Sequence, residues 1–177
     1  MIDWLINSGV IEEIIVIVLS ALPISELRGG LSVAITIFHM PWYYVFFLSF
    51  IGNIIPVPIL LLLFDAIAKI ISKMEIGEKF VNWVLERTRK RTGLIEKYER
   101  IGLILFVAIP LPFTGAWTGS IAAFLLGLRF WHAFFAILCG IIIAGAIVTC
   151  LNLLGWIGAV IAGVALSALA AYGWWKV

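Results

Sequence analysis

The sequence predicts an all-α integral membrane protein made of two inverted halves, each containing a re-entrant helical hairpin. Three observations lead to this class: an apolar composition, two similar apolar stretches that are each broken by proline, and a basic segment between them. Of the 177 residues, 64% are hydrophobic and only 12% are charged, whereas soluble domains are about one quarter charged. Because a full membrane span needs about 20 residues, the chain has room for one membrane domain and no second domain.

The first half is expected at residues 1–73. Two apolar pieces of about 13 residues flank Pro23 to Ser25, and each is too short as a helix to cross a hydrocarbon core of roughly 30 Å. Two short helices that meet at such a break indicate a re-entrant hairpin. The run from Trp42 to about Ile71 is long enough to form a span.

The second half is expected at residues 101–154 and has the same plan. The pieces 101–109 and 115–128 flank a break at Pro110 to Thr114, and a span follows from Phe130 to about Asn152. Residues 155–177 are expected to add a C-terminal transmembrane helix. The fold class is therefore two re-entrant hairpins, about three transmembrane helices and one interfacial amphipathic helix.

The two breaks are similar in sequence. Placing PISELRGGLSVAI over PFTGAWTGSIAAF aligns Pro23 with Pro112 and Ser25 with Thr114, and the same offset pairs Glu26 with Gly115. A hairpin that returns to its own side leaves each half with an odd number of crossings, so the halves are inverted. Inverted repeats with broken helices near the midplane are typical of transporters.

The segment 74–100 is predicted to be cytoplasmic, since nine of the twelve Lys and Arg residues fall between Lys69 and Arg100 and positive charge collects on that side. An apolar stripe at Ile76, Phe80, Trp83 and Val84 indicates an amphipathic helix that binds anionic inner-leaflet lipids. A solvated connector that only fixes topology is an equal alternative.

The hairpin tips are the predicted site. Ser25 and Thr114 are expected to cap the helices that follow them, which would leave free N–H groups and two positive helix ends for an anion. Arg28 could bind a phosphate or carboxylate through a forked pair of hydrogen bonds, and charged residues at membrane depth indicate function. Alternatively Glu26 and Arg28 only neutralise each other, or Glu26 is the protonatable group of a coupled transport cycle. The candidate substrate-binding residues are Ser25, Glu26, Arg28, Gly29, Gly30, Asn53, Thr114, Gly115, Trp117 and Thr118.

Several classes are excluded by what the sequence lacks. It contains no GxSxG, P-loop or HExxH motif and no spaced Cys or His cluster, so we expect no enzyme, cofactor or metal site, and nothing presents a nucleic-acid surface. Cys139 and Cys150 are interpreted as small packing residues. Gly155, Ala159 and Gly163 form a small-residue stripe that suits a close helix contact, either within the chain or across a homodimer.

The motifs ELRGGLSVAI, GNIIPVPILLL and FVAIPLPFTGAWTGSIAAFLLG resemble the prokaryotic small multi-drug export protein family. That family is similar in plan to the DedA superfamily, in which facing re-entrant hairpins carry acidic and arginine residues and are linked to lipid movement across the bilayer. The resemblance implies a multi-pass protein of the prokaryotic plasma membrane with Glu26 and Arg28 at its site. Thr114, Trp117 and Thr118 stand where DedA proteins have an arginine.

Two functions follow as expectations. The first is a transporter that translocates an anionic amphiphile, either a polyprenyl phosphate carrier such as undecaprenyl phosphate or a phospholipid, with protons or sodium as candidate coupling ions. The second is a proton-coupled small multidrug exporter in which Glu26 exchanges protons for cationic drugs. An arginine beside two helix N-termini repels a cation, which favours the first.

Overall fold

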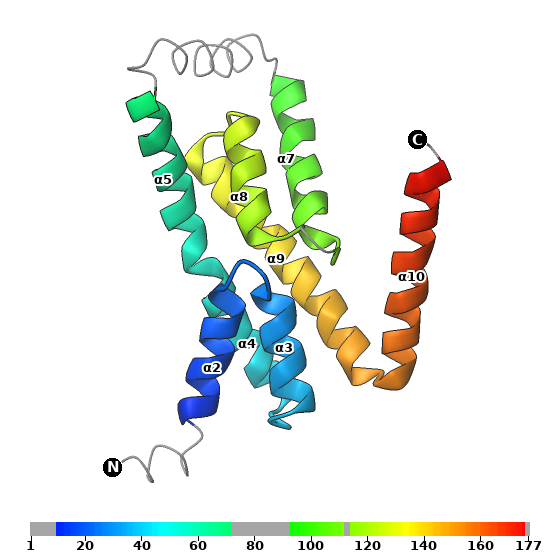
Figure 1. The fold of residues 1–177 in the computed structure, drawn as a ribbon. Helices are drawn as coiled ribbons and strands as arrows, with labels where there is room; N and C mark the ends of the chain where they lie inside the picture. The colour runs from blue at the N-terminus through cyan, green and yellow to red at the C-terminus, as the bar shows by residue number, and fades with distance from the viewer. Residues whose placement is uncertain (1–9, 72–92, 112–113, 176–177) are drawn as a thin grey trace.

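The computed structural model describes residues 10–71, 93–111 and 114–175, and every regular element in these ranges is an α-helix (Figure 1). The expected amphipathic helix around residues 76–91 lies outside them. Two described helical runs, Trp42–Phe64 and Phe130–Leu153, are long and apolar enough to cross a membrane. The predicted all-helical class with long apolar helices is confirmed at this level.

The first helical hairpin consists of α2 (Val10–Ala21) and α3 (Glu26–Thr36). Pro23 lies in the turn between them, and the amide of Glu26 closes the turn by donating to the carbonyl of Leu22 at 2.9 Å. The two helices pack closely at Gly30, where an added Cβ would lie 1.9 Å from Oγ of Ser20. This hairpin therefore depends on a glycine at the helix contact.

The first long apolar run is divided into α4 (Trp42–Ile54) and α5 (Pro56–Ile71), with a turn at Ile55. Proline has no N–H and its ring crowds the preceding turn, so a helix is interrupted where Pro56 enters it. The amide of Ile55 still donates to the carbonyl of Ile51 at 3.2 Å. The run predicted from Trp42 to Ile71 is thus two successive helices.

The second hairpin consists of α7 (Gly93–Ala108) and α8 (Ala116–Leu125). Residues 93–100, which we expected to belong to the connector, form the first turns of α7. The short α8 packs on α7 at Gly119, where an added Cβ would lie 2.5 Å from a methyl group of Val107. Gly127 follows α8 with a φ of 62° and ends it in the left-handed conformation that favours glycine.

The helix α9 (Phe130–Leu153) and the C-terminal α10 (Trp156–Trp175) are joined at Gly155, which has a φ of 57°. The two helices approach closely, because an added Cβ at Gly158 would lie 1.9 Å from the carbonyl oxygen of Leu151. Cys139 and Cys150 on α9 are exposed. The interpretation of both cysteines as packing residues was wrong, since each occupies the outward face of the helix.

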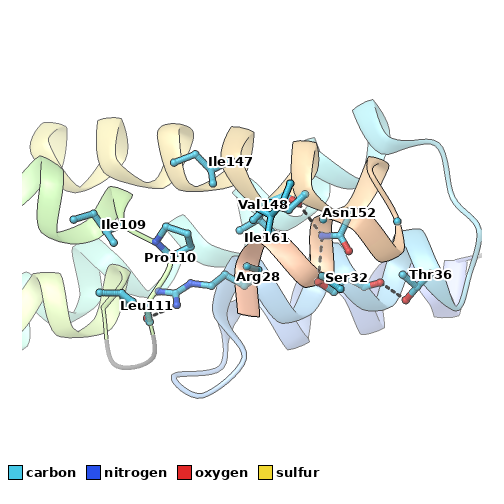
Figure 2. Close-up of a pocket in the computed structure, with 15 residues that line it drawn as sticks. Arg28, Ser32, Thr36, Ile109, Pro110, Leu111, Ile147, Val148, Asn152 and Ile161 are labelled. Carbon is cyan, nitrogen blue, oxygen red and sulfur yellow. Dashed lines mark hydrogen bonds between the residues drawn. The ribbon is translucent and has the colours of Figure 1, made fainter. Parts of the chain in front are cut away.

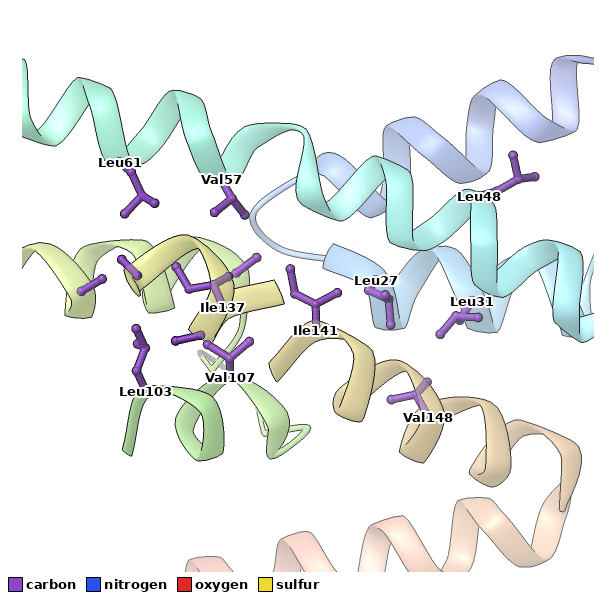
Figure 3. Packing of buried hydrophobic residues seen from close by; sticks show 14 of the residues in the cluster. Leu27, Leu31, Leu48, Val57, Leu61, Leu103, Val107, Ile137, Ile141 and Val148 are labelled. Carbon is purple, nitrogen blue, oxygen red and sulfur yellow. The ribbon is translucent and has the colours of Figure 1, made fainter. Parts of the chain in front are cut away.

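The two hairpins point toward each other and meet at their turns, while α9 runs obliquely beside both (Figure 1). Their buried side chains join one hydrophobic core with α5 and α9 (Figure 3). Leu27 and Leu31 enter it from α3, Leu103 and Val107 from α7, and Ile137 and Ile141 from α9. The core therefore fixes the turn of one hairpin against the turn of the other.

Candidate functional site

Glu26 is the first residue of α3 and is bonded to the other hairpin. Its Oε1 accepts a hydrogen bond from the backbone amide of Trp117 at 3.3 Å, and the amide of Ala116 also interacts with its carboxylate. Ala116 and Trp117 open α8, so the carboxylate occupies the position of an N-terminal cap supplied by another part of the chain. A negative group there is also favoured by the dipole of α8.

The carboxylate of Glu26 leaves no room for a side chain at Gly115. A Cβ added to Gly115 would lie 1.6 Å from Oε2 of Glu26. The φ of Gly115 is 165°, an extended value open to any residue, so the glycine is needed here for space and not for backbone freedom. Glu26 itself has a φ of 48° and is only 7% exposed. A buried glutamate in a left-handed conformation indicates that its surroundings hold it in place.

Arg28 is the third residue of α3 and also reaches the other hairpin. Its Nη1 donates to the carbonyl of Leu111, and its Nη2 lies 3.4 Å from Oγ1 of Thr114. The nearest oxygen of Glu26 is 3.8 Å from Nη2. The two charges therefore form a pair. The hydrogen bonds of each side chain, however, go to the second hairpin, so the two residues do more than neutralise each other.

Trp117 provides a third link between the hairpins. Its indole Nε1 donates to the carbonyl of Ala21 at 3.0 Å. Ala21 is the last residue of α2, where backbone carbonyls lack partners within the helix. Each hairpin thus satisfies a helix end of the other: Glu26 at the start of α8, and Trp117 at the end of α2.

The expected caps at Ser25 and Thr114 are wrong. Ser25 has helical backbone angles and its Oγ donates back to the carbonyl of Leu19, so it makes no cap for α3. The residue before α8 is Gly115, and the hydroxyl of Thr114 lies 2.7 Å from the carbonyl oxygen of Ile109 and accepts from the amide of Leu111 at 3.1 Å. Thr114 fixes the turn of the second hairpin instead, and the free anion site expected at the start of α8 is filled by Glu26.

The other predicted residues fall into two groups. Thr118 and Asn53 lie near the charged pair: Thr118 lines a cavity with Arg28, while Asn53 is 3% exposed and its Oδ1 accepts no hydrogen bond from the described residues. Gly29 and Gly30 lie at close contacts with the serines Ser25 and Ser20. Their positions are explained by packing, and Gly30 is buried.

Three cavities converge on Arg28. A cavity of about 270 Å³ at the hairpin turns is lined by Ser25, Glu26, Arg28, Thr114 and Thr118 together with Pro23 and Ile24. A minute one of about 10 Å³ lies between Asn53, Glu26 and Gly115. The largest, of about 650 Å³, lies between α3, α9, α10 and the end of α7 (Figure 2). Its volume is within the range of small-molecule sites, ~300–1,000 Å³.

The large cavity contains residues that the sequence analysis missed. Ser32 and Thr36 line it from α3, and Asn152 lines it from the end of α9. Nδ2 of Asn152 donates to Oγ of Ser32 at 3.3 Å and to the carbonyl of Val148 at 2.9 Å (Figure 2). The sequence does indicate the α3 part of this lining, because Arg28, Ser32 and Thr36 are spaced at i, i+4 and i+8 and therefore share one helix face. Asn152 offers no comparable pattern.

The described part of the chain is a helical fold with two candidate membrane spans and a charged junction between two opposed hairpins. The profile of the family described as "Putative small multi-drug export protein" matches residues 26–147. The chain belongs to the small multi-drug export protein family, as the sequence motifs indicated. This family and the two spans indicate a membrane location and a transporter rather than an enzyme. Searches of curated proteins and of solved structures find no significant match.

Proposed function

We propose that the protein is a membrane exporter of small amphiphilic molecules and that its substrates pass Arg28 at the junction of the two hairpins. The observation that carries this proposal is that Arg28 lines both the cavity at the hairpin turns and the large cavity beside α10. One charged side chain thus separates two spaces. A transporter needs such a barrier, with a binding space on each side of it.

The arrangement of the hairpins supports a transporter plan. Their turns face each other, and Glu26 contacts Gly115, the position that the proposed repeat pairs with it. Contacts between paired positions are expected when two inverted halves meet across a pseudo-two-fold axis in the membrane plane. We therefore propose that both hairpins are re-entrant and that the long helices and α10 cross the bilayer around them.

The two cavities would open to opposite sides. The basic segment 74–100 is predicted to be cytoplasmic. Its last residues form the start of α7, and this start and the end of α5 both lie at one end of the molecule (Figure 1). The large cavity extends along α3 to Thr36, at the other end. Export would then run from the cavity at the hairpin turns, past Arg28, to the cavity beside α10.

The charge at the junction favours acidic amphiphiles over cationic drugs. Arg28 lines the large cavity, and none of the other described residues that line this cavity is acidic. Glu26 lies on the far side of Arg28, where its carboxylate accepts bonds from α8. Membership of the family supports an exporter of small molecules more directly than a carrier of lipids. Transport of polyprenyl phosphate or phospholipid is a more specific form of the proposal. Proton coupling through Glu26 is the rival mechanism.

Reconstituted liposomes provide the test. Movement of an acidic amphiphile, an undecaprenyl phosphate, a fluorescent phospholipid and the lipophilic cation ethidium would be compared in the wild type, Glu26→Gln and Arg28→Ala. We expect Arg28→Ala to abolish movement of the acidic compounds. If only ethidium moves, and only when Glu26 is intact, the protein is a cation exporter and our charge assignment is wrong. If none of the compounds moves, the proposal of export fails.

A further inference from the structure

We propose that the cavity between α3, α9 and α10 is a two-part site for one acidic amphiphile. In this site the acidic group lies on the polar face of α3 that ends at Arg28, and the apolar body lies against α9 and α10. The inference rests on the proposed function for its biological meaning, but the binding site is argued from the cavity itself.

The polar part is a track along one face of α3. Arg28, Ser32 and Thr36 follow each other at intervals of four residues and all line the cavity. They span about 12 Å along the helix, from the buried junction to the exposed end of α3. Asn152 faces the middle of the track through its hydrogen bond to Ser32. The hydroxyl groups of Ser32 and Thr36 and the amide of Asn152 therefore offer hydrogen-bonding partners to an acidic head group along the whole length of the track up to the guanidinium.

Arg28 has the capacity to hold that head. A guanidinium carries five N–H donors in a fixed fork. The contacts with Leu111 and Thr114 use one N–H of each terminal nitrogen and leave three N–H groups outside these two contacts. The side chain keeps 23% of its surface exposed, with the cavity on one side. A carboxylate or phosphate could bind it in two-pronged fashion, whereas an ammonium group would meet like charge.

The opposite walls of the cavity are apolar. Ile147, Val148 and Leu151 contribute from α9, while Ala159, Ile161 and Ala162 contribute from α10. These walls offer no charge and suit an alkyl or aromatic body. A polar track beside an apolar wall matches a molecule with one acidic end and one apolar end. A molecule that is polar throughout, or apolar throughout, would leave one wall without a suitable partner.

Photo-crosslinking tests the site without requiring transport. Purified protein in discs of phosphatidylcholine would be irradiated with dodecanoic acid carrying a diazirine either at the end of its tail or next to its carboxylate, and labelled residues would be located by mass spectrometry. We expect the tail probe to label residues 147–162 and the head probe to label α3 between Arg28 and Thr36. Labelling of the outer faces of α4 and α5 instead, by either probe, would overturn the inference.

Competition identifies the head group and its source. Dodecanoate and dodecyl phosphate should displace both probes, whereas dodecyltrimethylammonium, which has the same tail, should be at least about tenfold weaker. Discs that contain phosphatidylglycerol show whether an anionic membrane lipid is the natural occupant, because such a lipid would then lower labelling as the free acids do. Equal competition by the cation would contradict the acidic specificity.

Two matched substitutions on α10 locate the apolar part. Ala162→Phe fills the cavity and should lower labelling about tenfold or more, while Ala168→Phe, at an exposed position outside the cavity lining, should leave it unchanged. If Ala162→Phe does not fold, Ala159→Phe replaces it as the cavity-filling variant, because Ala159 lines the cavity from the preceding turn of α10. Undiminished labelling in a folded cavity-filling variant would overturn the inference. Localised binding without movement in liposomes would contradict only the proposed export.

Discussion

Glu26 on the first hairpin and Gly115 on the second are in direct contact, with the carboxylate of Glu26 occupying the space that a side chain at residue 115 would need. The same carboxylate accepts a hydrogen bond from the amide of Trp117. The first hairpin therefore completes the start of α8, and Arg28, two residues after Glu26, bonds to Leu111 and Thr114 of the same second hairpin. Much of the function that we propose follows from this junction.

Substitution of Gly115 tests the contact. Gly115→Ala should destabilise the protein by about 1–3 kcal/mol, because the added methyl group overlaps Oε2 of Glu26. Thermal unfolding in detergent measures the effect, with Gly163→Ala as the control, since a Cβ at Gly163 meets nothing within 4 Å.

A double substitution shows that the clash is with Glu26. In a Glu26→Ala background the carboxylate is gone, so the further change Gly115→Ala should have little effect and the two substitutions should be strongly non-additive. Additive losses of stability would mean that the two residues do not share the space.

The substitution Glu26→Gln distinguishes two roles of Glu26, as the cap of α8 and as the carrier of a coupling proton. The amide oxygen of glutamine still accepts a hydrogen bond from Trp117, so we expect a smaller loss of stability than in Glu26→Ala, for which loss of a cap costs about 0.5–2 kcal/mol. Transport of an acidic amphiphile should persist in Glu26→Gln. If this variant is as stable as the wild type but transports nothing, Glu26 carries the coupling proton and its cap is secondary.

Trp117→Phe removes the indole donor while keeping an aromatic ring. The carbonyl of Ala21 loses its bond from Nε1, and the expected destabilisation is about 0.5–1.5 kcal/mol. Trp131→Phe is the control, because Trp131 is 64% exposed. A thermal shift that is equal in the two variants would show that the link between α2 and α8 does not contribute.

The two breaks between short helices could be predicted from the sequence because their signals are local. Proline at residues 23 and 110 interrupts two apolar stretches, and the structure ends α2 at Ala21 and α7 at Ala108. The division at Ile55 follows the same rule at Pro56. The start of α7 is the exception: the charged residues Lys97 and Arg100 favour a connector that extends to residue 100, whereas both lie in the first turns of the helix.

The contacts within the site were less predictable. Glu26 and Arg28 were identified by their charge in an apolar region, but their partners are mostly backbone groups, at Trp117 and Leu111, which no sequence pattern marks. Serine and threonine before a helix usually indicate a cap. Ser25 and Thr114 depart from that rule because their hydroxyl groups bond to carbonyls of the preceding helix or turn.

The most direct test of the central claim, that Arg28 separates two cavities opening to opposite sides, is thiol accessibility. In a background with Cys139→Ala and Cys150→Ala, Ser32→Cys reports the large cavity and Thr118→Cys reports the cavity at the hairpin turns. A membrane-impermeant, negatively charged thiosulfonate would be added to intact cells and to inverted vesicles. We predict that Ser32→Cys reacts only from the extracytoplasmic side and Thr118→Cys only from the cytoplasmic side; reaction of both from the same side would contradict the account.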